Sequence, residues 1–419
     1  LSLSVGACST GDDGAVLARS DASRSQGAAP ADDVDAAADS IRDFGVDLYP
    51  LLADRANDGN LVFSPASIVT ALAMTYTGAA GTTAEEMAAT LRFTLDDDSL
   101  HQAFNTLDTA IESRSWQGKD PEGKDVGVLV RTANSLWAQK DLAFEQDFLD
   151  SLAVNYGAGV RLVDYVTAAE AAREAINSWV ADQTNDKIPE LIGQGVLNAL
   201  TRLVLVNAVY LDATWAHQFE PDLTADGEFT TLSDNTVTTS MMRQTESFLY
   251  ASADGWQAVE LPYLRDELAM LLIVPDQDRF PAVEKDLATG LLEEAVSGLE
   301  SGYTVSLSMP KFEFRTQANL NTALASLGMV AAFDPGSADF CGMTKQEKLF
   351  ISDVIHEAYI NVDEEGTEAA AATAVVMELT SAMPGELIQL TIDRPFIFAI
   401  RDRDTGAILF LGRITDPTA

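Results

Sequence analysis

The feature that most limits the possible folds is the stretch 202–211, which reads RLVLVNAVYL and is almost continuously apolar. A run of this length without polar alternation is typical of a strand that is buried on both faces. A strand of this kind belongs inside a sheet with packed material on each side. We therefore expect a large sheet at the centre of the molecule, with this stretch as one of its inner strands.

Helical patterns dominate the first half of the chain and strand patterns the second. Apolar residues in 41–53 recur with the helical period, and 168–183 reads as an amphipathic helix. Strands at 256–261 and 268–274 are separated by a hairpin-like turn. This order predicts an α+β fold, with large mixed β-sheets and helices packed on them. Further strands are expected at 126–138, 303–314, 351–363, 387–392, 396–400 and 408–414, and further helices from 67 to 74 and from 320 to 327.

The chain reads as a short leader followed by one large domain. No Pro/Gly/Ser-rich linker or internal repeat interrupts 41–419. Residues 1–8 look like the tail of a bacterial lipoprotein signal, with small residues before Cys8, and 9–38 is rich in Ala, Asp, Gly and Ser. We expect 1–40 to be an export-signal remnant and a flexible tether, with Cys8 as a candidate for lipidation. The alternative is an ordinary export signal that has been trimmed; either route predicts an extracellular protein, secreted or anchored to the outer face of a bacterial membrane.

The charge limits the partners that the surface can attract. There are 65 acidic and 26 basic residues, for a net charge of −39. Such a surface repels nucleic acid and anionic membranes and speeds encounter with basic partners. Solubility in an acidic or saline medium explains the same charge without any partner. No run of Lys and Arg suggests a site for a heparin-type polyanion.

The sequence offers little for enzyme chemistry. The three histidines, His101, His217 and His356, are isolated, and no Cys or His pair has the spacing of metal ligands. We find no nucleophile that would pair with His356 in a catalytic triad. Cys341 is interpreted as a small buried residue. The expectation is a protein that is not an enzyme and holds no metal or cofactor.

One segment does not fit the pattern of strands around it. Residues 364–383 are mostly small and lie between two expected strands. Propensity alone favours a helix over 368–377, but such a helix would have only small side chains to bury. A long exposed loop is the alternative, and loops of this length are usually functional. The composition also suits a strand that slips into an existing sheet, with Gly366 as a flexible pivot.

The same segment begins with a recognisable motif. Residues 361–373 read NVDEEGTEAAAAT, and 390–398 read LTIDRPFIF. The first is similar to the reactive-loop hinge of inhibitory serpins and the second to the C-terminal signature of that family. The match runs in order over about 41–416. Other stretches with close family counterparts are NLVFSPAS at 60–67, TANSLW at 132–137, LVNAVYLDATW at 205–215, MPKF at 309–312, DFCGMT at 339–344 and VIHEA at 354–358.

This resemblance implies a serpin-like single domain with about eight or nine helices and an exposed reactive loop at about 364–386. It also implies roles for individual residues. The reactive bond is expected at Thr380–Ser381, although Leu379–Thr380 and Ser381–Ala382 stay open. Trp215 and Glu364 are expected to mark the point where the loop first enters the sheet. Opening of the sheet is expected to involve Trp215 and a cluster of polar residues beneath it. These polar residues are Ser64, Ser67, Asn207 and His356. The expected hinge comprises Glu364, Gly366, Thr367, Glu368, Ala369, Ala370, Ala371, Ala372 and Thr373.

By the same resemblance, the function is that of a suicide inhibitor, and we expect the protein to be a monomer. The protease cleaves the loop and is trapped as an acyl-enzyme while the loop inserts as an extra strand. Side chains from Thr367 onward must alternate into the interior, and those expected to enter are small and uncharged. Thr380 suits a shallow apolar pocket, as in elastase. Two alternatives stay open. The protein inhibits chymotrypsin-like or cysteine proteases on the same fold, or it has a binding role without inhibition.

Overall fold

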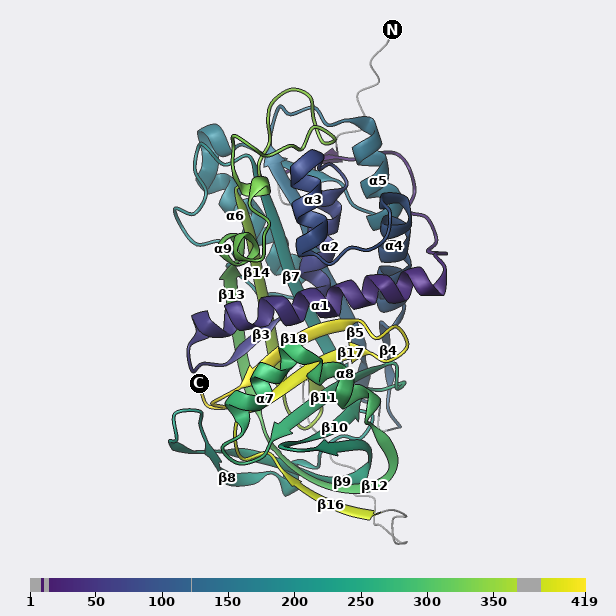
Figure 1. The fold of residues 1–419 in the computed structure, drawn as a ribbon, viewed down its shortest axis with the longest axis vertical. Helices are drawn as coiled ribbons and strands as arrows, with labels where there is room; N and C mark the ends of the chain where they lie inside the picture. The colour runs from purple at the N-terminus through teal and green to yellow at the C-terminus, as the bar shows by residue number, and fades with distance from the viewer. Residues whose placement is uncertain (1–8, 11–14, 122, 368–385) are drawn as a thin grey trace.

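The computed structural model describes residues 9–10, 15–121, 123–367 and 386–419. Within these residues the chain forms two large β-sheets, with most of the helices gathered around one of them (Figure 1). This arrangement confirms the predicted α+β class with large mixed sheets. The helices are α1 (Ala31–Ala56), α2 (Pro65–Tyr76), α3 (Gly81–Thr90), α4 (Asp97–Ser113), α5 (Gln146–Tyr156), α6 (Tyr165–Gln183), α7 (Phe280–Asp286), α8 (Leu291–Ser297) and α9 (Asn321–Ser326).

The main sheet has nine strands among the described residues, and its inner strands are long. Most neighbours are antiparallel, but β5 and β6 are parallel, and so are β7 and β14. The predicted strands at 126–138 and 351–363 are β5 and β14. In spatial order the strands are β1 (Ser9–Thr10), β2 (Val16–Ala18), β6 (Val160–Val163), β5 (Asp125–Gln139), β7 (Leu203–Thr214), β15 (Gly366–Thr367), β14 (Asp353–Val362) and β13 (Phe312–Asn319), with β4 (Trp116–Lys119) beside β5.

The second sheet lies below the main sheet in Figure 1 and also has nine strands among the described residues. The predicted hairpin at 256–274 is present as an antiparallel pair. In spatial order the strands are β16 (Glu386–Thr391), β12 (Glu300–Pro310), β9 (Thr236–Ala253), β10 (Trp256–Pro262), β11 (Leu268–Pro275), β17 (Phe396–Asp402), β18 (Ile408–Ile414) and β3 (Leu61–Phe63), with β8 (Ala225–Thr230) beside β9.

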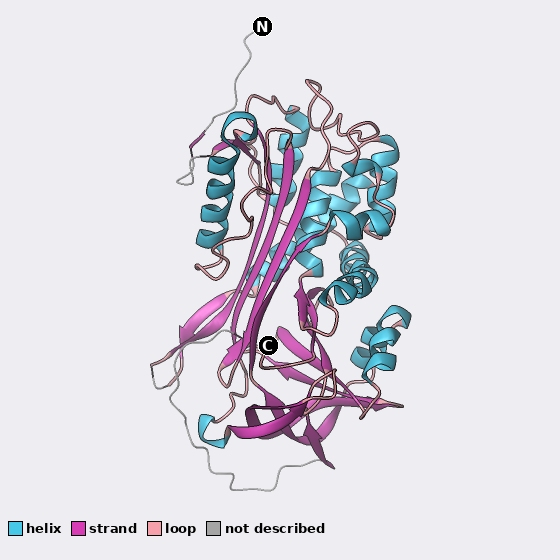
Figure 2. Ribbon diagram, turned by 90° about the vertical axis from the view of Figure 1, so that its left-hand side faces the viewer, coloured by secondary structure: helices cyan, strands magenta, loops and turns pink. Residues whose placement is uncertain are grey.

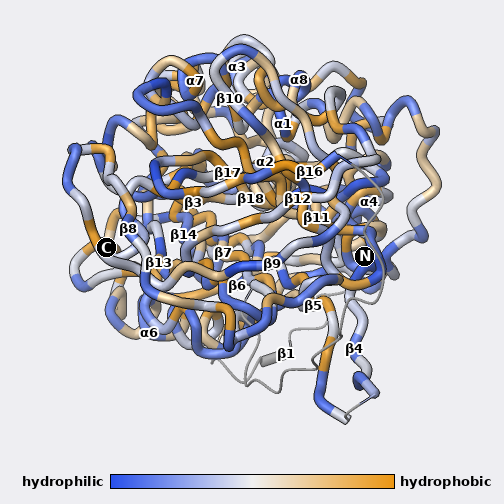
Figure 3. Tube along the Cα trace, turned by 90° about the horizontal axis from the view of Figure 1, so that it is seen from below, coloured by the Kyte–Doolittle hydropathy of each residue, from blue (hydrophilic) through white to orange (hydrophobic). Residues whose placement is uncertain are grey.

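Strand β7 is buried on both faces, as its apolar sequence predicts. Leu205 and Val209 belong to the larger hydrophobic core, whereas Val206 and Ala208 pack in a smaller core on the opposite face. Helix α6 supplies Ile176 and other residues of that smaller core. Figure 2 shows the main sheet edge-on, with helices on each side of it. Seen from below, the hydrophobic segments gather in the interior around α2 and β17, and hydrophilic ones lie at the periphery (Figure 3).

The N-terminal region differs from the expected tether. Helix α1 begins at Ala31, about ten residues before the predicted domain boundary at residue 41. The segment 15–30, which we call the N-terminal strap, is also built into the fold, since β2 pairs with β6 at the edge of the main sheet. The prediction of a flexible tether is therefore corrected for residues 15–40, while Cys8 lies outside the described residues.

Arg24 fixes the strap to α4. Its guanidinium contacts Asp108 at 2.5 Å and Glu112 at 3.0 Å, and its Nε donates to the side chain of Asn105 at 2.9 Å. Just after this point the chain lies so close to α4 that a Cβ on Gly27 would overlap the backbone of Thr106. The strap thus replaces solvent along one face of α4.

Among the described residues, no helix combines the length and apolar character that crossing a bilayer requires.

Replacing Arg24 tests whether the strap belongs to the folded unit. We expect Arg24→Ala to lower the free energy of unfolding by about 1–3 kcal/mol, because Asp108 would keep its partly buried charge without its partner. Urea unfolding monitored by circular dichroism measures the change. Arg19→Ala removes an exposed arginine of the same strap and serves as the control. Equal stability of both variants and the wild type would contradict an energetic role for the strap.

Candidate functional site

The candidate site is a slot in the main sheet between β7 and β14. The two strands pair directly and in parallel from Asp353↔Val204 to Ala358↔Val209. Beyond that point they separate, and β15 lies between them, antiparallel to both. Thr367 is the partner of Ala213 on one side and of Val362 on the other. The slot is therefore occupied at one end and closed by direct pairing at the other.

Gly366 is required in the slot by a close approach of two backbones. A Cβ at this position would overlap the carbonyl oxygen of Ala213 on β7. A residue with a side chain cannot occupy this register unless β7 moves. The space between the strands is thus one reason for a glycine at 366, and the pivot role expected from the sequence stays a prediction.

The side chain of Thr367 enters the protein interior. It is 2% exposed, and its hydroxyl lies 2.6 Å from that of Tyr263. The ring of Tyr263 stacks on Trp215, with 4.5 Å between centroids and 9° between planes. Burial raises the pKa of Tyr263 far above its usual value, so its hydroxyl stays protonated and able to donate. The inward direction of Thr367 agrees with the alternation expected for this segment.

Glu364 is held at the mouth of the slot by three elements. Its carboxylate contacts the ammonium of Lys311 at 2.5 Å and accepts from the hydroxyl of Thr224 at 2.8 Å. Its carbonyl accepts from the N–H of Phe219 at 2.8 Å. Burial opposes the charged form of Glu364, but these partners outweigh it and lower the pKa of the carboxyl. Trp215 lies beside it, and its Nε1–H donates to the carbonyl of Asp363 at 3.0 Å.

The four polar residues expected beneath the sheet are brought together where β7 and β14 pair directly. Asn207 and His356 are opposite each other in that pairing, and Ser64 caps α2 by accepting from the N–H of Ser67. The N–H of Ser64 donates to Nε2 of His356 at 3.2 Å, and Nδ1 of His356 donates to the side-chain oxygen of Asn207. Asn207 in turn donates to the hydroxyl of Ser67 at 2.5 Å. We call these four residues the central cluster; each is fully buried.

Asn134 also belongs with this cluster, although no role was predicted for it. Its side-chain oxygen accepts from the hydroxyl of Ser67 at 2.8 Å and from the amide of Asn207 at 2.5 Å. It is the partner of Asn207 on β5, so three neighbouring strands contribute one polar residue each at the same level. The motif TANSLW at 132–137 was a usable signal, because it places the polar Asn134 at the start of the mostly buried end of β5.

The comparisons with known proteins agree with this geometry. The family model described as "Serpin (serine protease inhibitor)" matches residues 39–417. The chain belongs to the serpin family. The match begins after the N-terminal strap, so the strap lies outside the part that the family model describes.

Similar proteins include serpins of several kinds. An uncharacterised serpin-like protein of Thermococcus kodakarensis is 40% identical over 90% of this chain and 85% of the relative. Leukocyte elastase inhibitors are 38% identical in Xenopus laevis and 35% identical in Homo sapiens, each over 89% of this chain and 97% of the relative. A thermophilic serpin, Tengpin, in the native state has a similar structure, with a TM-score of 0.79 and 25% identity over 96% of this chain and 99% of that one. So does thyroxine-binding globulin in complex with thyroxine, with a TM-score of 0.78 and 29% identity over 91% of this chain and 99% of that one.

Part of the serpin loop falls outside the described residues. The described part of the hinge is Glu364–Thr367, and β16 resumes the chain at Glu386. The predicted reactive bond, Thr380–Ser381, is outside, and so are the hinge positions Glu368, Ala369, Ala370, Ala371, Ala372 and Thr373.

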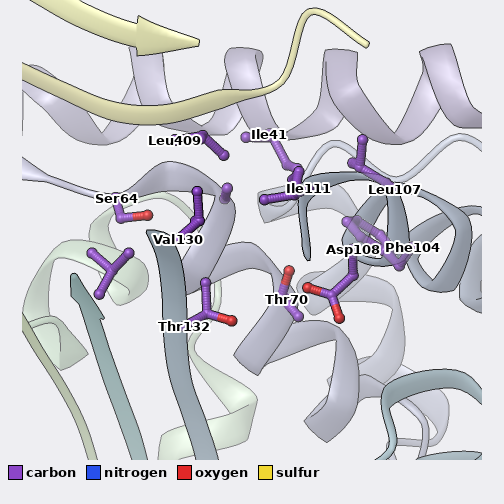
Figure 4. Close-up of a pocket in the computed structure, with 12 residues that line it drawn as sticks. Ile41, Ser64, Thr70, Phe104, Leu107, Asp108, Ile111, Val130, Thr132 and Leu409 are labelled. Carbon is purple, nitrogen blue, oxygen red and sulfur yellow. The ribbon is translucent and has the colours of Figure 1, made fainter. Parts of the chain in front are cut away.

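A small cavity lies next to the central cluster in this serpin. Ser64, the N-cap residue of α2, and Thr70 of α2 line it, together with Phe104 and Leu107 of α4 (Figure 4). Its volume is about 20 Å³, which leaves room for roughly one water molecule. The cavity is too small for a substrate. The slot itself is already occupied at one end by a strand, β15.

Cys341 and the expected absence of a metal site complete the account of the predicted sites. Cys341 was expected to be buried and is exposed, so that prediction is wrong; it sits in a turn at the surface after Asp339. No group of three His, Cys, Asp or Glu side chains in the described ranges is arranged to hold a metal ion.

His356 gives the central cluster a measurable dependence on pH. Burial lowers the pKa of His356 to about 3, so it is neutral in the folded protein at neutral pH. In the unfolded chain a histidine binds a proton below pH ~6.5. The unfolded protein then binds more protons than the folded one, and stability is lost as the pH falls from about 6.5 toward 3.

We expect His356→Gln to remove this contribution. The stability of the wild type should fall more steeply with acidification than that of the variant, by up to about 1.4 kcal/mol per pH unit. Asp212 and Glu357 act in the opposite direction, since burial raises their pKa values to about 6 and about 7. The comparison is therefore between the two proteins, by urea midpoints from pH 4 to pH 7.5. Parallel pH profiles would mean that folding does not lower the pKa of His356.

Proposed function

We propose that this serpin is a suicide inhibitor of an elastase-like serine protease, and not an enzyme. The observation that carries the proposal is the slot, in which Gly366 and Thr367 already lie as a short strand between β7 and β14. A loop that begins inside a sheet has a path along which the rest of it can follow. The leukocyte elastase inhibitors among the relatives support the target class.

The proposed mechanism begins with cleavage of the bond between Thr380 and Ser381. The protease serine attacks the carbonyl carbon of Thr380, the peptide bond breaks, and the amine of Ser381 leaves after taking up a proton. The carbonyl of Thr380 is now an ester on the protease. Insertion then extends β15 along the slot and carries the ester with it, and a strand of ~15 residues at ~3.3 Å each spans ~50 Å. The displaced protease is distorted before water can hydrolyse the ester.

Insertion along this path has a structural requirement. The six paired positions from Val204 to Val209 on β7 must separate from β14, and the bond between Asn207 and His356 must break with them. The inserted strand would then pair with β7 and β14 in their place. Since Thr367 faces inward, Ala369, Ala371 and Thr373 are expected to face inward after it. All three are small and uncharged, which supports an inhibitory role.

The target class follows from the residues near the reactive bond. No Lys or Arg occurs between Glu364 and Gln389, which disfavours trypsin-like proteases. Thr380 fits a shallow apolar pocket, and cleavage after Leu379 or Met377 would instead suit a chymotrypsin-like protease. A cysteine protease is a further alternative on the same fold. The structural similarity to thyroxine-binding globulin in complex with thyroxine keeps a non-inhibitory binding role as an alternative, which the small hinge residues disfavour.

The surroundings of the protein are part of the same proposal. A net charge of −39 would steer a basic protease toward this serpin. We propose that it acts as an extracellular monomer, secreted or held at the outer face of a membrane through a lipid on Cys8. Mass spectrometry of the protein from its native membrane fraction tests the anchor.

The proposed function is tested with pancreatic or neutrophil elastase. We expect an adduct that survives a denaturing gel, together with a peptide whose N-terminus is Ser381 in the intact mass spectrum. Trypsin serves as the matched control and should form no such adduct. Cleavage of the loop with full recovery of elastase activity would overturn the proposal.

Replacing Thr367 tests the insertion step. Its side chain is buried against Tyr263, so Thr367→Arg would place an unpaired charge in the interior whenever the hinge occupies the slot, and insertion requires the hinge to be there. We expect this variant to be cleaved as a substrate, with at least about a tenfold rise in the moles of serpin consumed per mole of elastase inhibited. Thr367→Ser is the control and should inhibit like the wild type. Undiminished inhibition by the arginine variant would show that the loop does not insert by this route.

A further inference from the structure

The hairpin formed by β4 and the start of β5 lies beside the hinge. Its strands pair from Trp116↔Val128 to Lys119↔Asp125, and Val128 is also the partner of Ala213 on β7. Ala213 in turn is the partner of Thr367. The residues before Val128 therefore continue past the end of β7, and the N–H of Gly127 donates to the hydroxyl of Thr214 at 3.2 Å. The hairpin can reach the hinge across the end of this strand.

Lys124 makes that contact. Its ammonium lies 2.6 Å from Oε1 of Glu365, and the side chain of Glu365 is only 9% exposed. The other carboxylate oxygen, Oε2, is buried and has no hydrogen-bond partner among the described residues. A buried carboxylate that loses its counter-charge carries a large desolvation cost. The position of Glu365 in the fold thus depends on Lys124.

The turn of the hairpin holds Lys124 in place. Its N–H donates to the side chain of Asp120 at 2.8 Å, and its carbonyl accepts from the N–H of Asp120 at 3.0 Å. Glu365 is fixed from its other side, since its carbonyl accepts from the N–H of Trp215 at 2.9 Å. The ion pair therefore joins two ordered segments of backbone, which keeps the entropic cost of forming it low.

We propose that Lys124 is a positioning residue that holds the hinge in register inside the slot before the loop is cut. The hinge keeps the same register when β15 is extended, so the ion pair survives insertion and is lost only when the hinge leaves the slot. It favours the conformation from which insertion starts. The consequence for inhibition rests on the proposed function, because faster insertion competes better with hydrolysis of the ester. The position of the hinge can be measured without a protease.

Hydrogen–deuterium exchange of the peptide that contains 364–367 tests the position directly. We expect Lys124→Met to raise its exchange rate by about fivefold or more, the equivalent of losing an ion pair of about 1 kcal/mol. Lys119→Met is the matched control, because Lys119 lies in the same hairpin but pairs with the exposed Asp125. Lys124→Arg should keep the wild-type rate, and the exchanged pair Lys124→Glu with Glu365→Lys should restore it. Unchanged exchange in Lys124→Met, or an equal rise in Lys119→Met, would overturn the inference.

Inhibition of elastase tests the functional consequence. We expect Lys124→Met to raise the moles of serpin consumed per mole of elastase at least about twofold, and Lys119→Met to leave this ratio unchanged. A loosened hinge with an unchanged ratio would overturn the positioning role in inhibition. If the wild type forms no adduct with any protease, the proposed function fails, and the exchange experiment still decides whether Lys124 positions the hinge.

Discussion

The pairing between β7 and β14 is the interaction on which the rest of the structure depends. Over six positions the two strands satisfy each other's backbone groups, and beyond Ala358 they stand apart by the width of one strand. Asn207 and His356 are opposite each other in this pairing, so the hydrogen bonds of the central cluster and of the backbone are broken by the same movement. One boundary in the sheet therefore determines both where the hinge can lie and which polar contacts an extra strand must displace.

Under the proposed mechanism, this arrangement explains how a closed sheet could accept a further strand. Opening it exposes buried polar groups whose hydrogen bonds contribute roughly 0.5–1.5 kcal/mol each, and more when one partner is left unpaired. Under the proposed mechanism, an inserted strand returns backbone hydrogen bonds on two sides instead of one. The uninserted fold is then kinetically trapped. The barrier to opening the sheet maintains it, although its free energy is higher than that of the inserted form. Under the same mechanism, the central cluster would lie at that barrier and the hinge at the point where opening starts.

The sequence predicted the parts of this architecture that have local patterns. The apolar run of β7, the helical period in α1 and the hairpin-like turn between β10 and β11 each follow from neighbouring residues. The N-terminal strap was missed because its composition resembles that of a disordered segment, while its order comes from edge pairing with β6 and from the contacts of Arg24. Asn134 and Lys124 were missed because their partners are distant in sequence. No local sequence pattern links Lys124 to Glu365. Likewise, no local pattern shows that Cys341, in a turn, is exposed.

The two ends of the loop are anchored in different sheets. The hinge pairs in the main sheet, whereas β16 pairs with β12 in the second sheet and is followed by β17 and β18, whose residues are all buried. In a chain cut at Thr380–Ser381, the C-terminal piece would therefore stay in place as part of a two-piece complex with no covalent link. It would form much of the interior of the second sheet and separate from the larger piece only when that sheet unfolds. The cut protein would still migrate as one particle under native conditions.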